Sequence, residues 1–203
     1  MIIFLNGTSS AGKTSTAKKI QELYPEPMLH MGIDHFVLSV DPRFFGEGTE
    51  SHLGYQFIRK DDPTGAKIEI QKGPFGKQLS QALHRALRVV VDLHINLIID
   101  DLLFAEEDFI DYLELFGDRE VFFIAIKPPM HVVEAREKIR GDRGIGLTRG
   151  LYDLVYQDKI FDLELDTSEM TPEESAQAIL NYIKMNPHPT AFQKNALKIL
   201  NTV

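Results

Sequence analysis

The chain of 203 residues contains no cysteine, which excludes disulfide bonds and thiol chemistry. It also lacks any apolar run that approaches the roughly 18 residues needed for a membrane-spanning helix. Its N-terminus has neither the basic segment nor the cleavage site of a secretory signal. We therefore expect a protein that has no membrane partner and works in the reducing environment of the cytoplasm.

Basic residues are outnumbered by acidic ones: the chain has 22 lysines and arginines, 30 aspartates and glutamates, and a net charge of −8. This balance argues against broad binding to nucleic acids or anionic membranes, although a local basic cleft can still hold ATP. The remaining composition, 43% apolar and 26% charged, is that of an ordinary globular domain with enough chain for a sizeable core.

The most informative stretch is rich in glycine and lies at the start of the chain. An apolar run over residues 1–5 comes first. The pattern G-x-x-x-x-G-K-[ST] is then completed by Gly7, Gly12, Lys13 and Thr14. An amphipathic run follows, so the pattern stands between a strand and a helix, as a phosphate-binding loop does. A glycine-rich turn that binds nothing is the alternative.

Each part of this loop has a physical role in binding a nucleotide. Glycine lets the backbone curl until consecutive N–H groups point at a phosphate, and the helix that follows adds the positive end of its dipole. Lys13 supplies a charge for the outer phosphates, and the Thr14 hydroxyl can ligate Mg²⁺. The residues predicted to bind ATP are Gly7, Thr8, Ser9, Ser10, Ala11, Gly12, Lys13, Thr14 and Ser15.

Strands and helices alternate along the rest of the chain. The predicted strands, most of them continuously apolar, cover residues 1–5, 28–31, 96–101, 121–126 and 161–165. The predicted helices cover residues 15–24, 76–93, 106–116, 128–140, 148–159, 171–184 and 191–200. This alternation predicts an α/β fold with a parallel sheet that helices cover on both faces. Residues 35–76 are expected to be irregular, apart from a small hairpin over 55–59 and 67–70.

Carboxylates follow the ends of two predicted strands, at the edge where parallel sheets bind their ligands. Asp34 follows the second strand and is placed to accept the proton of an acceptor hydroxyl, or else serves as a turn or helix-cap residue. Asp100 and Asp101 end the third strand, where a carboxylate can hold Mg²⁺ through water. One of these two can instead be a structural hydrogen-bond acceptor, and spacing alone does not say which.

Arginines gather at the end of the helix predicted over residues 128–140. Arg136 and Arg140 are four residues apart and share a helix face, and Arg143 follows in a glycine-bounded loop. This arrangement predicts a lid that closes over ATP and brings positive charge to the transition state, with Arg149 as a further candidate. The alternative is a solvated helix C-terminus, where the helix dipole favours cations in any case.

Histidine and aromatic residues are open to more than one interpretation. The seven histidines show no metal-ligand spacing, and His35, beside Asp34, is expected at the surface or facing a substrate. The aromatic residues of the long irregular stretch form either an acceptor pocket or a local core beneath a loop. They are Phe36, Phe44, Phe45, Tyr55 and Phe57.

Five segments together carry a family resemblance: residues 5–14, 32–34, 98–101, 137–143 and 162–167. Tyr152 and Tyr156, which precede the last segment, belong to the same pattern. In this order the segments resemble the chloramphenicol phosphotransferase family of P-loop kinases, over the chain from the first strand to about Lys184. The resemblance implies a three-layer P-loop NTPase fold of the kinase type, with strand order 2-3-1-4-5 and a small lid. It also implies that Asp34 is the general base and Arg143 the lid arginine. Broader similarity to shikimate and adenylate kinases implies that Arg136 stacks on adenine.

The expected organisation is a P-loop kinase domain over residues 1–186 and a C-terminal helical extension over residues 187–203. Within the domain, residues 35–75 form an insert that binds the acceptor, and residues 140–150 form the lid. The insert resembles the family poorly, so the resemblance supports the type of reaction better than it supports the identity of the acceptor. The extension either docks on the acidic surface of the domain or on a partner, or closes a hydrophobic edge as an ordinary terminal helix.

The leading hypothesis is a phosphotransferase that uses ATP and Mg²⁺ and acts on a hydroxyl of a small molecule, either a chloramphenicol-like antibiotic, as in antibiotic resistance, or a related metabolite. Its candidate catalytic residues are Lys13, Asp34, Arg140 and Arg143, and its candidate metal ligands are Thr14, Asp100 and Asp101. The alternatives are a nucleoside or nucleotide kinase, and a nucleotide-regulated interaction module without turnover. Nucleic acid is not an expected partner, and a homo-oligomer is compatible with the sequence.

Overall fold

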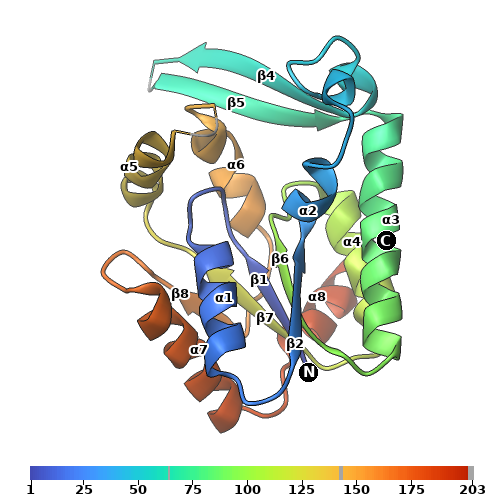
Figure 1. Ribbon diagram of the computed structural model, residues 1–203, viewed down its shortest axis with the longest axis vertical. Coiled ribbons are helices and arrows are strands. Elements are labelled where there is room, and N and C mark those ends of the chain that lie inside the picture. The colour runs from blue at the N-terminus through green and yellow to red at the C-terminus, as the bar shows by residue number, and fades with distance from the viewer. Residues whose placement is uncertain (64, 142–143, 201–203) are drawn as a thin grey trace.

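A parallel sheet forms the centre of the molecule in the computed structural model, which describes residues 1–63, 65–141 and 144–200 (Figure 1). Its five strands lie in the order β2-β6-β1-β7-β8. Their bounds are β1 Ile2–Asn6, β2 Met28–Gly32, β6 Asn96–Asp101, β7 Val121–Ile126 and β8 Leu163–Leu165. Counted along the chain, this is the order 2-3-1-4-5 that the family resemblance implied. Both β1 and β7 are buried over their whole length, which explains their continuously apolar sequences.

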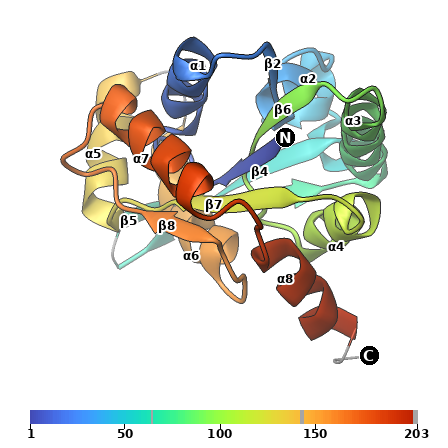
Figure 2. The same cartoon turned by 90° about the horizontal axis from the view of Figure 1, so that it is seen from below.

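Helices cover both faces of the sheet (Figure 2). One face packs against α1 (Lys13–Leu23), α5 (Met130–Arg140) and α7 (Pro172–Met185). The other packs against α3 (Pro74–Asp92), α4 (Glu106–Phe116) and α8 (Ala191–Leu200). Successive side chains of a strand point to opposite faces, so Ile3 and Leu5 of β1 enter the first core, while Ile2 and Phe4 enter the second. The three-layer α/β architecture is therefore confirmed.

Local sequence signals account for the start of α7. It begins with a capping box, in which Thr171 Oγ1 accepts from the Glu174 N–H at 3.2 Å and Glu174 Oε2 accepts from the Thr171 N–H at 2.8 Å. Pro172 takes the first helical position, where a missing N–H costs nothing. Among the helices of the described residues, none combines the length and the apolar character that crossing a membrane requires.

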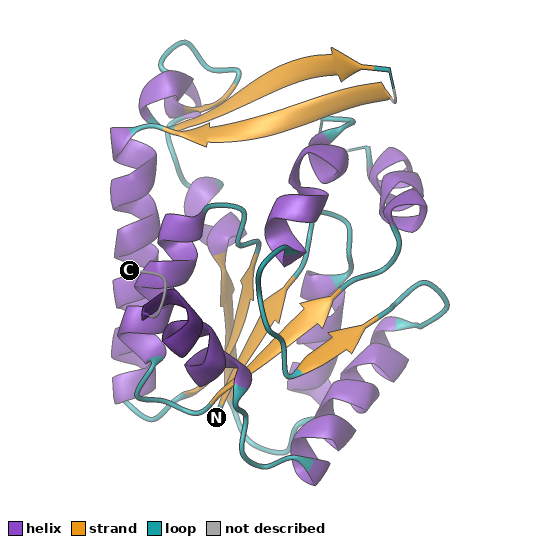
Figure 3. Cartoon of the chain, turned by 180° about the vertical axis from the view of Figure 1, so that it is seen from behind, coloured by secondary structure: helices purple, strands orange, loops and turns teal. Residues whose placement is uncertain are grey.

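A second, smaller sheet lies across the carboxyl ends of the central strands (Figures 1 and 3). An antiparallel hairpin of β4 (Tyr55–Asp62) and β5 (Gly65–Lys72) confirms the predicted hairpin and is longer than predicted, and β3 (Phe45–Gly46) pairs with it in parallel. The segment before the hairpin is less irregular than expected. It contains the short helix α2 (Ile33–Val37) and the 3-10 helices η1 (Pro42–Phe44) and η2 (Ser51–Leu53).

Helix α6 (Leu147–Tyr156) lies between this hairpin and the central sheet (Figure 1). It shares a third apolar cluster with both of them, because Leu147 and Leu151 pack with Ile68 of β5 and Ala125 of β7. The hairpin therefore rests on the central domain through α6.

The aromatic residues around the hairpin form a local core. Tyr55 is 3% exposed, and its hydroxyl bonds with Ser80 Oγ at 2.9 Å and donates to Gly76 O at 3.1 Å. The ring centroids of Phe45 and Phe57 lie 5.2 Å apart. Because these contacts are made within the small sheet β3–β5 and with α3, they favour the local-core interpretation over the acceptor pocket.

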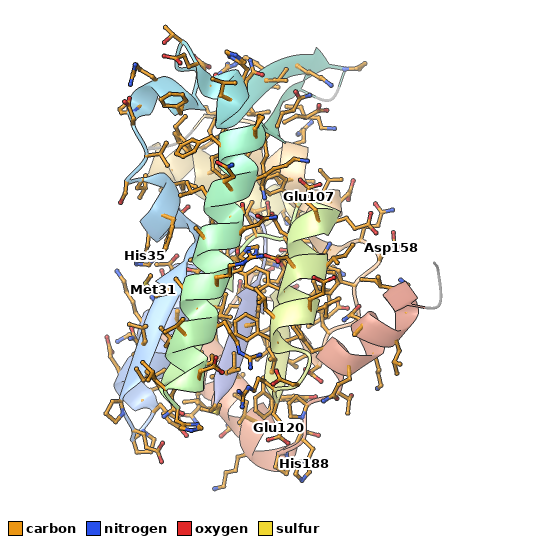
Figure 4. All side chains as sticks on the ribbon, turned by 90° about the vertical axis from the view of Figure 1, so that its right-hand side faces the viewer. Met31, His35, Glu107, Glu120, Asp158 and His188 are labelled. Carbon is orange, nitrogen blue, oxygen red and sulfur yellow. The ribbon has the colours of Figure 1, made fainter. Side chains whose placement is uncertain are left out.

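The C-terminal helix α8 closes one edge of the core. Phe192 is 2% exposed, and its ring centroid lies 6.0 Å from that of Phe4 and 5.4 Å from that of Phe123. His188, in the segment that leads from α7 into α8, lies beside Glu120, which follows the end of α4 (Figure 4). Of the two alternatives for the C-terminal extension, the structure supports an ordinary terminal helix that covers a hydrophobic edge.

Candidate active site

A cavity of about 690 Å³ opens at the carboxyl ends of β1, β2 and β6. This is the edge of the sheet where ligands of parallel α/β folds bind. The predicted site residues that line it are Ser9, Ser10, Ala11, Gly12, Lys13, Thr14, Ser15, Asp34, Asp100, Arg136 and Arg140. Four predicted residues are not part of this lining: Gly7, Thr8, Asp101 and Arg149. Arg143 lies outside the residues that the structure describes.

The phosphate-binding loop has the backbone that its glycines predict. Gly12 has a φ of +104°, a left-handed value that favours glycine. A Cβ on Gly7 would lie 2.6 Å from Ile126 O, so the loop passes too close to β7 for a side chain. Ser10 Oγ is one of two buried side-chain polar atoms without a hydrogen-bond partner among the described residues. A buried hydroxyl in need of a partner, in a loop of this shape, fits a bound phosphate.

Asp100, at the end of β6, is held beside this loop. Thr14 Oγ1 donates to Asp100 Oδ2 at 2.6 Å, and Lys13 Nζ lies 3.7 Å from Asp100 Oδ1. His30 Nε2, from β2, lies 3.3 Å from Asp100 Oδ2. Burial opposes ionisation of Asp100, but Lys13, His30 and Thr14 outweigh it and hold the pKa of this carboxyl below its ordinary value. An ionised carboxylate therefore lies next to the Thr14 hydroxyl.

Asp101, the neighbouring residue, points into a different environment. It is 4% exposed, and its carboxylate accepts from Tyr112 OH at 2.8 Å and from the Leu102 N–H at 2.7 Å. Burial, with a contribution from the nearby Asp108 charge, raises its pKa. Consecutive side chains of a strand face opposite ways, so only Asp100 can meet Thr14. Asp101 has the hydrogen bonds expected of the structural acceptor, and it does not line the cavity that Thr14 and Asp100 share.

Asp34 reaches the same cavity from the first turn of α2. Gly32 makes this approach possible, because a Cβ there would lie 2.0 Å from Asp100 O. Gly32 is also the N-cap residue of α2, and its N–H donates to His35 Nδ1 at 3.2 Å. The helix-cap alternative for Asp34 is therefore not supported. His35, the middle residue of α2, lines the cavity as well (Figure 4).

The two arginines of α5 border the cavity from the other side. Arg136 Nη1 donates to Ala11 O at 3.3 Å, and its Nη2 donates to Thr167 O at 2.6 Å. These bonds fix the guanidinium at the phosphate-binding loop, and Arg140, one turn further, lines the same cavity. Arg149, by contrast, donates from Nε to Glu134 Oε1 at 2.7 Å and joins α6 to α5. Arg149 is therefore not brought to the site.

Three side chains to which the sequence analysis gave no role hold the site in place. His30 contacts Asp100, Tyr156 OH accepts from the Thr8 N–H at 3.2 Å, and Thr148 Oγ1 donates to Ser9 O at 3.3 Å. A polar residue within the apolar segment 28–31 is a signal that could have indicated His30. No local signal could have indicated Thr148 and Tyr156, which lie 139 and 148 residues from their partners in the loop.

The donor set fits a metal that is bound together with a nucleotide. Among the described residues, no group of three or more histidine, aspartate or glutamate side chains could hold a metal ion by itself. Mg²⁺ is commonly bound by one or two protein oxygens, substrate phosphates and water. Thr14 and the ionised Asp100 supply oxygens of this kind, and Lys13, which is 8% exposed, supplies a charge for the phosphates.

The fold and this site define a P-loop phosphotransferase of the kinase type. Residues 1–184 match the family described as chloramphenicol phosphotransferase-like protein. A Mycobacterium tuberculosis H37Rv protein named "Putative O-phosphotransferase Rv2636" is 30% identical over 201 residues, which cover 98% of this chain and 89% of that protein. The chain belongs to the chloramphenicol phosphotransferase-like family.

Solved structures of small-molecule kinases share the fold. The Mycobacterium tuberculosis APS kinase in complex with AMPPNP and APS superposes with a TM-score of 0.62 at 14% identity, over 91% of this chain and 97% of that one. The Acinetobacter baumannii shikimate kinase in complex with shikimate gives a TM-score of 0.60 at 16% identity, over 91% and 93% of the two chains. At these identities the likeness concerns the fold alone.

Proposed function

We propose that this protein transfers the γ-phosphate of ATP to a hydroxyl group of a small molecule. One observation carries the proposal: a single cavity is lined by the phosphate-binding loop, the Thr14–Asp100 pair and Asp34. The first two suit a nucleotide with its metal, and the third suits the removal of a proton from an acceptor.

The residues divide the reaction between them. The loop amides and Lys13 bind the phosphates. The Thr14 hydroxyl and Asp100 would hold Mg²⁺, which would supply further positive charge to the phosphates. Asp34 accepts the proton of the acceptor hydroxyl as its oxygen forms a bond to the γ-phosphorus. The bond between the γ-phosphorus and the bridging oxygen breaks, and ADP leaves with the bond electrons. Arg140, with Arg143, contributes positive charge to the transition state, and Arg136 stacks on adenine.

The acceptor we propose is a hydroxylated molecule with an apolar body, either a chloramphenicol-like antibiotic or a related metabolite. Family membership supports the antibiotic. The lining of the cavity supports the apolar body, because Ile33, Leu38 and Leu102 line it together with Asp34. Residues 35–75 complete the acceptor side, and residues 140–150 act as the lid over ATP.

The test is a screen of hydroxyl compounds, chloramphenicol and nucleosides among them, with Mg-ATP and with ADP release as readout. We expect at least one acceptor to stimulate ADP release well above the rate with water. Asp34→Ala then lowers kcat by ~10²–10⁴-fold with little change in the affinity for ATP, because only the proton acceptor is lost. The control Asp153→Ala changes an exposed aspartate outside residues 35–75 and leaves kcat unchanged.

Two results would count against the proposal. Normal ATP binding without turnover on any acceptor would favour a nucleotide-regulated interaction module. A full rate in Asp34→Ala would remove Asp34 from the role of base. Turnover confined to nucleosides or nucleotides would show that the acceptor is a nucleoside or nucleotide instead of an antibiotic-like molecule. The proposed transfer of the γ-phosphate to a hydroxyl would be unaffected.

A further inference from the structure

Helix α6 stands between the phosphate-binding loop and the hairpin, and buried hydrogen bonds tie it to the loop. Near its C-terminus, Tyr156 OH accepts from the Thr8 N–H at 3.2 Å. Near its N-terminus, Thr148 Oγ1 donates to Ser9 O at 3.3 Å. Because the bonds come from both ends of the helix, α6 cannot shift relative to the loop without breaking them.

A carboxylate of α5 fixes the N-terminus of α6 as well. Glu137 is 3% exposed, and it accepts the N–H groups of Gly146 at 2.9 Å and Thr148 at 2.7 Å. These N–H groups belong to the first turn of a helix, where no partner exists within the helix itself. Helix α6 is therefore a fixed support on the donor side of the site.

The opposite side of α6 touches the backbone of β5 directly. A Cβ on Gly150 would lie 1.7 Å from Ile68 O, a position that no side chain can occupy. One turn earlier, the Ile68 N–H donates to Gly146 O at 2.9 Å. Glycine weakens the middle of a helix relative to alanine, and the close approach of β5 supplies a physical reason for it here. The hairpin thus rests on the bare backbone of α6.

The open end of the hairpin is anchored to other helices. Tyr55 and Lys72 are paired across its two strands. Tyr55 OH bonds with Ser80 Oγ of α3 at 2.9 Å, and Lys72 Nζ donates to the same Ser80 Oγ at 3.1 Å and pairs with Asp108 of α4. With this end fixed on α3 and α4, the place where β5 rests on α6 sets the tilt of the hairpin.

We infer that Gly150 is a positioning residue that sets how closely the hairpin β4–β5 approaches the phosphate-binding loop, and thereby where the acceptor lies relative to ATP. The inference rests on the proposed function, in which residues 35–75 complete the acceptor side. A side chain at position 150 must push the hairpin outward, because the loop and Glu137 hold α6 in place. Ile68, which is 3% exposed and packs with Leu147 and Leu151, is the complementary contact on the hairpin.

The first measurement needs no acceptor. Amide hydrogen exchange over residues 65–72 is compared in the wild type, Gly150→Ala, Ile68→Ala and the control Asp153→Ala, an exposed position of the same helix. We expect exchange in β5 to be at least about tenfold faster in Gly150→Ala, because local opening becomes easier when packing contacts are lost. It should also rise in Ile68→Ala, which adds no bulk, and stay unchanged in Asp153→Ala and over residues 1–23 of every variant.

The second measurement uses the acceptor that the hydroxyl-compound screen identifies. In Gly150→Ala we expect kcat/KM for this acceptor to fall by about 10–100-fold, as misplacement of a bound reactant does. The KM for ATP and the slow release of ADP with water as acceptor should change by less than about twofold. A general folding defect in Gly150→Ala would impair both the KM for ATP and the kcat/KM for the acceptor. In that case Ile68→Ala provides the test, because it should lower kcat/KM for the acceptor and leave the KM for ATP unchanged.

The two measurements separate the inference from the proposed function. Unchanged exchange in β5 together with an unchanged kcat/KM in Gly150→Ala would overturn the role of Gly150. If the wild type phosphorylates no acceptor, the proposed function fails. In that case the exchange measurement still determines whether Gly150 holds the hairpin in place.

Discussion

At the scale of single residues, the carboxylate of Asp100 is held by three side chains from two other elements. Thr14 and Lys13 come from α1, and His30 comes from β2. Their combined effect overcomes the cost of burial and keeps Asp100 ionised. Asp101, one residue further, accepts hydrogen bonds from Tyr112 OH and the Leu102 N–H instead. The two carboxylates therefore have different surroundings, and we propose that only Asp100 serves Mg²⁺.

Asparagine substitutions test this difference. We expect Asp100→Asn to raise the Mg²⁺ concentration for half-maximal activity by about 10–100-fold, the usual effect of losing a partner of a metal ligand. Asp101→Asn is the matched control, and it should lower the melting temperature while the Mg²⁺ dependence stays unchanged. Magnesium titrations of activity and thermal melts of both variants supply the measurement. Equal effects of the two substitutions on the Mg²⁺ dependence would contradict the assignment.

The sequence predicted the residues of this site unevenly, for physical reasons. Gly7 to Thr14 form one continuous motif, so spacing alone identifies them. Asp34 was indicated because it follows a predicted strand, and such strand ends meet at one edge of the sheet. The choice between Asp100 and Asp101 depended on which face of β6 each occupies, and two adjacent carboxylates do not reveal that. His30 contributes through a tertiary contact across the strands β2 and β6.

At the scale of elements, Glu137 is the residue that joins α5 to α6. It accepts two N–H groups from the start of α6 and is almost completely buried. Three residues before it on the same helix, Glu134 pairs with Arg149 at a more exposed position. The two glutamates connect the same pair of helices and differ mainly in burial, which makes them a matched pair for mutation.

We predict that Glu137→Ala lowers the free energy of unfolding by roughly 1–3 kcal/mol, because it leaves buried N–H groups without an acceptor. Glu134→Ala should cost less than about 1 kcal/mol, as expected for an ion pair that is only partly buried and still in contact with solvent. Urea unfolding followed by circular dichroism measures both. A loss in Glu134→Ala as large as that in Glu137→Ala would mean that α6 is not held by its buried cap.

The elements themselves were largely predictable, since local rules determine most of them. The capping box of α7, the alternation in the hairpin and the apolar strands each depend on neighbours in sequence. The contact between β5 and α6 depends on Gly150, and an isolated glycine in a helical pattern gives no indication of its partner. Helix α2 was missed because a single short turn after a strand has no periodicity to detect.

At the scale of the whole molecule, α8 belongs to the core although it lies beyond residues 1–184 that match the family. We predict that Phe192→Ala lowers the free energy of unfolding by about 3–5 kcal/mol, the usual cost of removing a buried aromatic ring. Leu197→Ala, on the 60% exposed Leu197 of the same helix, should change it by less than about 0.5 kcal/mol. Denaturant unfolding measures both. If Phe192→Ala is neutral, α8 is a detachable extension rather than part of the domain.

The fate of the γ-phosphate distinguishes phosphotransfer to an acceptor from hydrolysis, and radiolabelled ATP follows it directly. With γ-³²P-ATP, Mg²⁺ and the acceptor from the screen, we predict that the label appears in a phosphomonoester of the acceptor, in amounts equal to the ADP formed. In Asp34→Ala, formation of this product should fall by ~10²–10⁴-fold while ATP still binds. Recovery of the label only as inorganic phosphate, whatever acceptor is present, would contradict the account.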